Sequence, residues 1–116
     1  TAFDVLLTDT VPSGLLITGI TSTTLAGGAT TDSAIAITGG GTGLTGQFDI
    51  PVNGSVTVVY TAVLQTSLVP GQSLVNDADA TFTSLNGTVT GERTGGDVTE
   101  PTDNTHPDSG TTLNNY

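Results

Sequence analysis

Five acidic residues near the C-terminus form the group of side chains with the greatest potential for chemistry in this sequence. They fall within seventeen residues and are interleaved with threonine and asparagine: Glu92, Asp97, Glu100, Asp103 and Asp108. Calcium takes roughly six to eight oxygen ligands, which carboxylate and amide oxygens supply, and extracellular modules bind it at about 10⁻⁴ to 10⁻³ M. The pattern therefore predicts calcium (Ca²⁺) binding in this segment.

A second pair of carboxylates lies in a stretch that alternates like a strand. Asp77 and Asp79 share one face of that strand and would add ligands if the face lies at the end of a sheet. The acidic spacing matches neither the EF-hand loop nor the glycine-rich nonapeptide calcium repeat. A solvated, disordered acidic tail would have the same composition. The sequence leaves both interpretations open.

Catalytic chemistry has much weaker support. His106 is the only histidine, and it shares a low-complexity segment with Ser109, so an exposed loop histidine is a better interpretation than a Ser-His-Asp site. Most of the carboxylates that could act as a glycosidase pair lie in that segment too. Residues 39–43 are glycine-rich but lack the spacing and the lysine of a phosphate-binding loop. We expect no enzymatic activity.

Composition excludes several classes of partner. The chain of 116 residues has one Lys or Arg against eleven Asp or Glu, for a net charge of -10. Nucleic acids and anionic membrane surfaces would repel it. The chain has no cysteine for disulfides or thiolate metal sites, and no apolar run of about 18 residues to span a membrane. Because it also has no methionine, we expect a processed protein or a piece of a longer one.

The remaining composition favours β-structure. Twenty-five threonines suit half-exposed strands, and sixteen glycines suit turns. Alternating apolar residues predict strands, including residues 2–9, 34–38, 55–64 and 74–85, whereas residues 21–33 are polar and predict a loop. About seven short strands and no helical periodicity predict an all-β, antiparallel, immunoglobulin-like β-sandwich. The predicted core comprises Phe3, Val5, Leu7, Ile35, Ile37, Val56, Val58, Tyr60 and Phe82.

The composition changes after residue 91. Residues 92–116 are acidic and contain few apolar side chains, so they cannot build a core of their own. We therefore expect a β-sandwich domain over residues 1–91 and an irregular acidic linker or tail over residues 92–116.

Three motifs resemble the Ig-like repeat domain of bacterial and archaeal surface proteins, a family catalogued as a domain of unknown function. They are FDVLLTDTVPSGL at residues 3–15, VNGSVTVVY at residues 52–60 and NDADATF at residues 76–82. Together they cover about residues 2–90, in the order that the family shows. The resemblance implies an extracellular or cell-surface location and a place in a tandem array.

The chain departs from this family at its start. Family members usually begin with a strand before the position of residues 1–4, so the domain looks as if it lacks its first strand. A neighbouring copy could supply that strand by β-strand addition, in which main-chain hydrogen bonds complete a sheet edge. Residues 111–116 at the end of the tail are a candidate for the segment that reaches the neighbour.

These observations predict a structural repeat unit of a bacterial surface protein or self-assembled fibre, with calcium stiffening the acidic linker. The alternative is an adhesin module that binds glycan or a host surface through loops such as residues 21–33, although these loops contain no aromatic residue. Lys-Asn crosslinks are impossible without lysine. Asn53 and Asn86 fit the glycosylation pattern, but hairpin turns are the better explanation of both.

Overall fold

The protein consists of antiparallel β-strands in this computed structural model, which describes residues 1–90 and 93–97. Residues 96 and 97 are described by their backbone only. The described part contains seven strands and no helix, which confirms the all-β prediction. The strands are β1 (Ala2–Thr10), β2 (Leu15–Ala26), β3 (Thr30–Thr38), β4 (Gly43–Ile50), β5 (Ser55–Leu64), β6 (Ala78–Thr83) and β7 (Thr94–Asp97). No helix in these residues is therefore long and apolar enough to cross a membrane.

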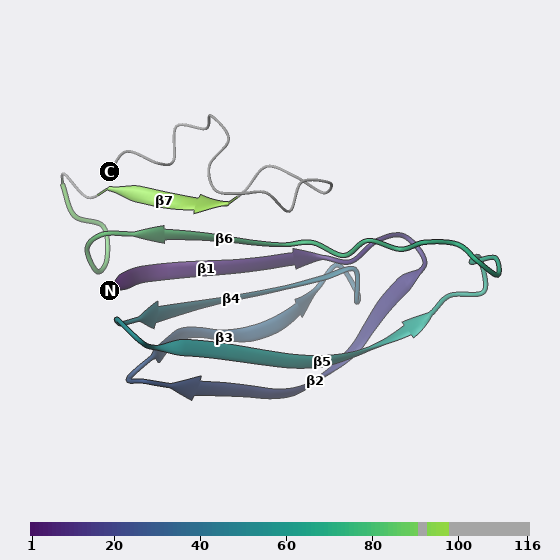
Figure 1. Ribbon diagram of the computed structural model, residues 1–116, viewed down its shortest axis with the longest axis horizontal. Coiled ribbons are helices and arrows are strands. Elements are labelled where there is room, and N and C mark those ends of the chain that lie inside the picture. Colours follow the sequence, from purple (N-terminus) through teal and green to yellow (C-terminus); the bar gives the residue numbers. More distant parts are fainter. Residues whose placement is uncertain (91–92, 98–116) are drawn as a thin grey trace.

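The strands form two sheets of unequal size (Figure 1). Sheet A has five strands in the order β3-β4-β1-β6-β7, and sheet B has only β2 and β5. Every pairing is antiparallel. In Figure 1, β7 and β2 lie on opposite sides of the molecule, and sheet B lies on the β3 side of sheet A.

Three apolar side chains form the buried cluster where the two sheets meet. Val11, Ile17 of β2 and Leu44 of β4 are 6%, 3% and 2% exposed, and five partly buried residues pack against them: Leu7, Leu15, Ile20, Ile35 and Tyr60. The most completely buried side chain is Phe48 of β4, at 1%. Burial of such side chains supplies most of the folding free energy, at about 25 cal/mol per Å² of apolar surface.

The predicted core is correct in part. Val5 is buried, and Phe3, Leu7, Ile35, Val56, Val58, Tyr60 and Phe82 are half-buried. Ile37 is 38% exposed, which contradicts its place in the core. It lies in β3, the edge strand of sheet A, which has a neighbour on one side only.

Several predicted element boundaries were wrong. The loop expected at residues 21–33 is mostly strand: β2 continues to Ala26, Gly27 and Gly28 turn the chain with φ of 60° and 84°, and β3 begins at Thr30. The long strand expected at residues 74–85 is reduced to β6. The composition also placed Thr94–Asp97 in an irregular linker, yet these residues form β7, because the edge of β6 offers them backbone partners.

A polar network also joins the two sheets. Asp9 of β1 is 6% exposed, and its Oδ2 accepts hydrogen bonds from the Tyr60 hydroxyl at 2.9 Å and the Asn76 amide at 3.1 Å. The Asn76 amide also lies 3.2 Å from the Tyr60 hydroxyl oxygen. Within the described residues, Asp9 Oδ1 is buried and accepts no hydrogen bond. The network therefore ties β5 of sheet B to β1 of sheet A through one buried carboxylate.

Candidate metal centre

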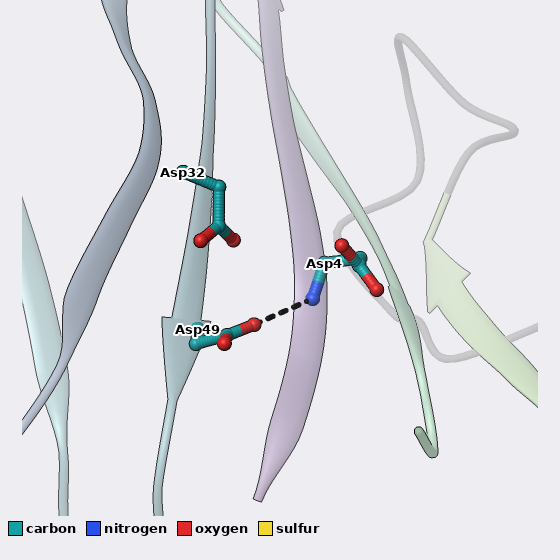
Figure 2. Close-up of side chains that lie close together, drawn as sticks. All are labelled: Asp4, Asp32 and Asp49. Atoms are coloured by element: carbon teal, nitrogen blue, oxygen red, sulfur yellow. Dashed lines mark hydrogen bonds between the residues drawn. The ribbon is translucent and has the colours of Figure 1, made fainter. Parts of the chain in front are cut away.

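Three aspartates from three adjacent strands come together in sheet A. Asp4 of β1, Asp32 of β3 and Asp49 of β4 each offer one carboxylate oxygen, and these oxygens all lie within 4.8 Å of one another. Figure 2 shows the Asp32 carboxylate pointing toward Asp49, and the hydrogen bond that joins Asp49 to the backbone nitrogen of Asp4. We call these residues the acidic cluster.

β-Bulges position the two outer members of the acidic cluster. β4 lies between β3 and β1, and both neighbours contain an extra residue close to Asp49. In β1 the register shifts between Ala2 and Val5, where Asp4 has a φ of 49°. In β3 it shifts between Thr31 and Ser33, on either side of Asp32. A bulge re-aims a side chain relative to the regular alternation of a strand, which is how residues far apart in the sequence converge here.

Neutral donors hold two of the three carboxylates. The backbone N–H of Asp4 donates to Asp49 Oδ1 at 2.9 Å, and the Asn86 amide donates to Asp49 Oδ2, also at 2.9 Å. Asp4 Oδ2 accepts from the backbone N–H of Gly87 at 2.7 Å and from the Thr83 hydroxyl at 3.3 Å. Its Oδ1 accepts from the Gln47 amide at 3.4 Å. Hydrogen bonds to a carboxylate are about twice as strong as neutral ones, so these donors fix both side chains.

Asp32 is the member whose ionisation the cluster opposes. Desolvation, then repulsion from Asp49 and Asp4, and a hydrogen bond to Asp49 raise the pKa of Asp32 above its ordinary value of 3.8. A raised pKa stabilises the fold at pH values below 3.8, and this contribution is lost as the pH rises through the raised value. Because Asp32 is exposed, the free energy involved is below about 1 kcal/mol. Asp49 and Asp4 therefore repel a negative charge on Asp32 in the absence of a cation.

A divalent cation would remove that repulsion, and the acidic cluster could hold one. Carboxylate oxygens are the ligands that hard cations such as calcium and magnesium prefer. The chain has a single arginine and no lysine, so positively charged side chains that could neutralise the acidic cluster are almost absent from it. Solvent can reach the site because Asp32 is exposed and Asp4 and Asp49 are half-buried.

The metal ligands predicted from sequence are different residues. Asp77 and Asp79 are half-buried near the start of β6 and do not belong to the acidic cluster. The predicted ligands that lie outside the described residues, by their side chain or altogether, are Glu92, Asp97, Glu100, Asp103 and Asp108. The calcium site predicted for the tail thus stays a prediction.

The sequence contained one signal for the acidic cluster, which lies in its strand-like stretches and not in its acidic motifs. Asp is depleted in strands, yet Asp4 and Asp49 each lie between two apolar residues in a strand-like stretch. A carboxylate in that setting needs an explanation, such as a bulge or a bound cation. Their separation of 45 positions hides the contact between them, since no local spacing rule relates them.

Comparisons with known proteins add no family to this geometry. The sequence matches no protein-family model, no curated protein and no solved structure.

Proposed function

We propose that this protein is a structural unit of an extracellular surface assembly. In this proposal the two sheets form an immunoglobulin-like sandwich, a strand from a neighbouring copy extends sheet B, and calcium binds the acidic cluster. The observation that carries the proposal is the free edge of β5. The composition and the three repeat-like motifs support the extracellular, structural role.

β5 lacks the features that normally protect a sheet edge. Within the described residues it pairs with β2 only, so one side of a ten-residue strand presents unpaired backbone groups. The strand contains no charged residue and no proline. Both register shifts of the β2–β5 pair insert the extra residue in β2, so β5 itself is regular. Val59, Val63 and Leu64 are 45%, 46% and 71% exposed. Such an edge is a template for another strand.

Each of the other edges has at least one feature that protects it from pairing. β2 carries the two bulges of sheet B. β3 contains Asp32 and two register shifts of its own. β7 spans four residues and ends at Asp97. Bulges, charges and short length are the devices by which natural sheets avoid pairing with other chains. Their absence from β5 alone indicates that this edge is the one used for pairing.

The charge distribution favours a second copy as the neighbour. Two chains with a net charge of -10 repel each other, so they can approach closely only along an uncharged surface. β2 and β5 together contain no charged residue, which makes sheet B such a surface. A strongly basic partner would gain nothing at this edge. A two-stranded sheet is also only marginally stable by itself, so an added strand would stabilise sheet B.

Blocking the β5 edge is expected to weaken assembly. Lysines at Val59 and Val63 place charges along the exposed edge of β5, and charged side chains, lysine above all, keep a sheet edge from pairing with another chain. We expect V59K/V63K to raise the concentration needed for self-association by about tenfold or more. Sedimentation velocity and electron microscopy of the full chain provide the measurement.

The matched control is S22K/T24K, which adds the same charge to the same sheet on its other edge. Ser22 and Thr24 are exposed, and they pair with Val59 and Thr57. This control should associate like the unmodified chain. Equal loss of association in both variants, or a chain that stays monomeric throughout, would contradict strand addition at β5.

Calcium is expected to stabilise the fold through the acidic cluster. At about 10 mM, roughly 10 to 100 times the expected dissociation constant, it should raise the free energy of unfolding by about 1.4–2.7 kcal/mol. D49N should remove most of this increase, because Asp49 interacts with both other members of the acidic cluster, Asp4 and Asp32. Urea unfolding with calcium or with a chelator measures the difference.

D77N makes the same change of charge at the strand pair that the sequence offered as additional ligands. It should keep the calcium response if the acidic cluster is the binding site. Loss of the response in D77N, with D49N unaffected, would instead locate the ion near Asp77, and equal responses in all three proteins would exclude both positions.

A further inference from the structure

The turn at Asn86 and Gly87 places a reactive dipeptide against two carboxylates. The turn follows β6 and is exposed, and Gly87 has a φ of 71°. The backbone N–H of Gly87 donates to Asp4 Oδ2 at 2.7 Å. The Asn86 side-chain amide donates to Asp49 Oδ2 at 2.9 Å. Each nitrogen whose bonds would change in a cyclisation of Asn86 thus contacts its own carboxylate.

We propose that Asn86 is a self-modification site, at which Asp4 assists attack of the Gly87 nitrogen on the Asn86 side chain and converts Asn86 to aspartate. The Gly87 nitrogen bonds to Asn86 Cγ and passes its proton to Asp4. The bond from Cγ to Nδ2 breaks, and Nδ2 leaves as ammonia with a proton returned from the carboxylates. Water then opens the five-membered imide to aspartate or isoaspartate. The sum is asparagine plus water giving aspartate plus ammonia, with no redox change.

The local chemistry supports each step. Glycine has no Cβ, so its nitrogen is open to approach and its backbone is free to rotate toward the side chain. A 2.7 Å hydrogen bond to a carboxylate is short and charge-assisted, which places a base on the proton to be removed. Asp49 accepts a hydrogen bond from the leaving nitrogen, Nδ2 of Asn86. Reacting groups held together in this way gain the rate advantage of proximity.

The chain contains an internal reference for this chemistry. Asn53 and Gly54 form the same dipeptide in another turn, and Asn53 is also exposed. There the backbone N–H of Gly54 donates to the carbonyl oxygen of Pro51 at 2.8 Å. A peptide carbonyl is a very weak base, so it does not remove the proton as a carboxylate does. The two dipeptides thus differ in the one feature that the proposal requires.

The conversion would change the acidic cluster. The Asn86 amide now donates to Asp49, whereas an aspartate at this position could only accept. The hydrogen bond would be replaced by repulsion between two carboxylates, and the turn would lose one of its two attachments to the cluster. Three carboxylates would become four.

Mass spectrometry of the full chain tests the proposal. The chain is incubated in chelator at neutral pH, and the gain of one mass unit is followed in peptides that contain Asn86 or Asn53. In the folded chain, Asn86 should convert about tenfold faster than Asn53 or more, a part of the roughly 10²- to 10⁴-fold that acid–base assistance provides. In urea the two rates should become equal. This comparison needs no variant, and an Asn86 rate no higher than that of Asn53 in the folded chain would overturn the proposal.

D4N supplies the second test. It should slow conversion of Asn86 about tenfold and leave Asn53 unchanged, with folding confirmed by circular dichroism. An unchanged Asn86 rate in folded D4N would show that Asp4 takes no part. If D4N does not fold, the comparison of folded and urea-treated chains still decides the question.

Discussion

Replacing Phe48 with alanine is expected to lower the free energy of unfolding by about 3–5 kcal/mol. Phe48 is 1% exposed and is the largest fully buried side chain among the described residues. Its removal loses the transfer free energy of the ring and leaves a cavity that surrounding strands can fill only in part. Domains of this size have a total stability of about 5–15 kcal/mol, so the loss is a large fraction of it.

Urea unfolding measures the effect, with an unchanged slope showing that the change is in stability rather than in the compactness of the unfolded state. Leu64→Ala is the matched control. Leu64 is 71% exposed, so its truncation should change stability by less than about 0.5 kcal/mol. Similar losses for the two variants would contradict the assignment of Phe48 to the core.

The second large effect is expected at Tyr60. Tyr60→Phe removes the hydroxyl that donates to Asp9 Oδ2 and leaves the buried carboxylate with one donor, the Asn76 amide. Hydrogen bonds to charged groups contribute about 1.5–3 kcal/mol, so we expect a loss of that size. The hydroxyl of the neighbouring Thr61 makes only exposed hydrogen bonds, to the Gly19 carbonyl at 3.3 Å and with the Thr18 hydroxyl at 3.1 Å, so Thr61→Val should cost less than about 1 kcal/mol. A loss for Tyr60→Phe no larger than for Thr61→Val would show that the network does not stabilise the contact between the sheets.

Tyr60 also gives the fold a dependence on alkaline pH. Burial, then its hydrogen bond to Asp9 and the Asp9 charge, raise the pKa of Tyr60 above its ordinary value of 10.0. The folded state therefore holds the phenol proton more tightly than the unfolded state does. This contribution is complete below pH 10.0 and is lost as the pH rises through the raised value. The free energy of unfolding, measured from about pH 8 to about pH 11, should fall more steeply with rising pH for the unmodified chain than for Tyr60→Phe.

Local patterns in the sequence were sufficient to predict the class of structure. Threonine content, turn residues and two-residue alternation predict antiparallel strands, and β1 and β5 lie close to the predicted positions. These features depend on neighbours in the chain, so they can be read without knowledge of the fold. The sequence also predicted a strand at residues 55–64, which is β5, the strand whose free edge carries the proposed function.

The most buried residue was not predicted from local patterns. Phe48 is absent from the predicted core, although it lies in a short stretch that ends before Pro51. Sheet order places β4 between β3 and β1, so Phe48 has strand neighbours on both sides. Ile37 has an equally apolar pattern but lies in the edge strand β3 and stays exposed. The burial of Phe48 therefore depends on the central position of β4 in sheet A as well as on alternation along the strand.

The acidic cluster depends on the tertiary structure in the same way. The sequence drew attention to the dense carboxylates of residues 92–108, because density is visible along the chain. Asp4, Asp32 and Asp49 are sparse in the sequence, and they meet because β1 and β3 both bulge beside β4. A bulge reverses the face on which a side chain lies and depends on pairing with another strand. The sequence by itself thus determined the class of structure and the overall charge, and only strand pairing decided which charges face one another.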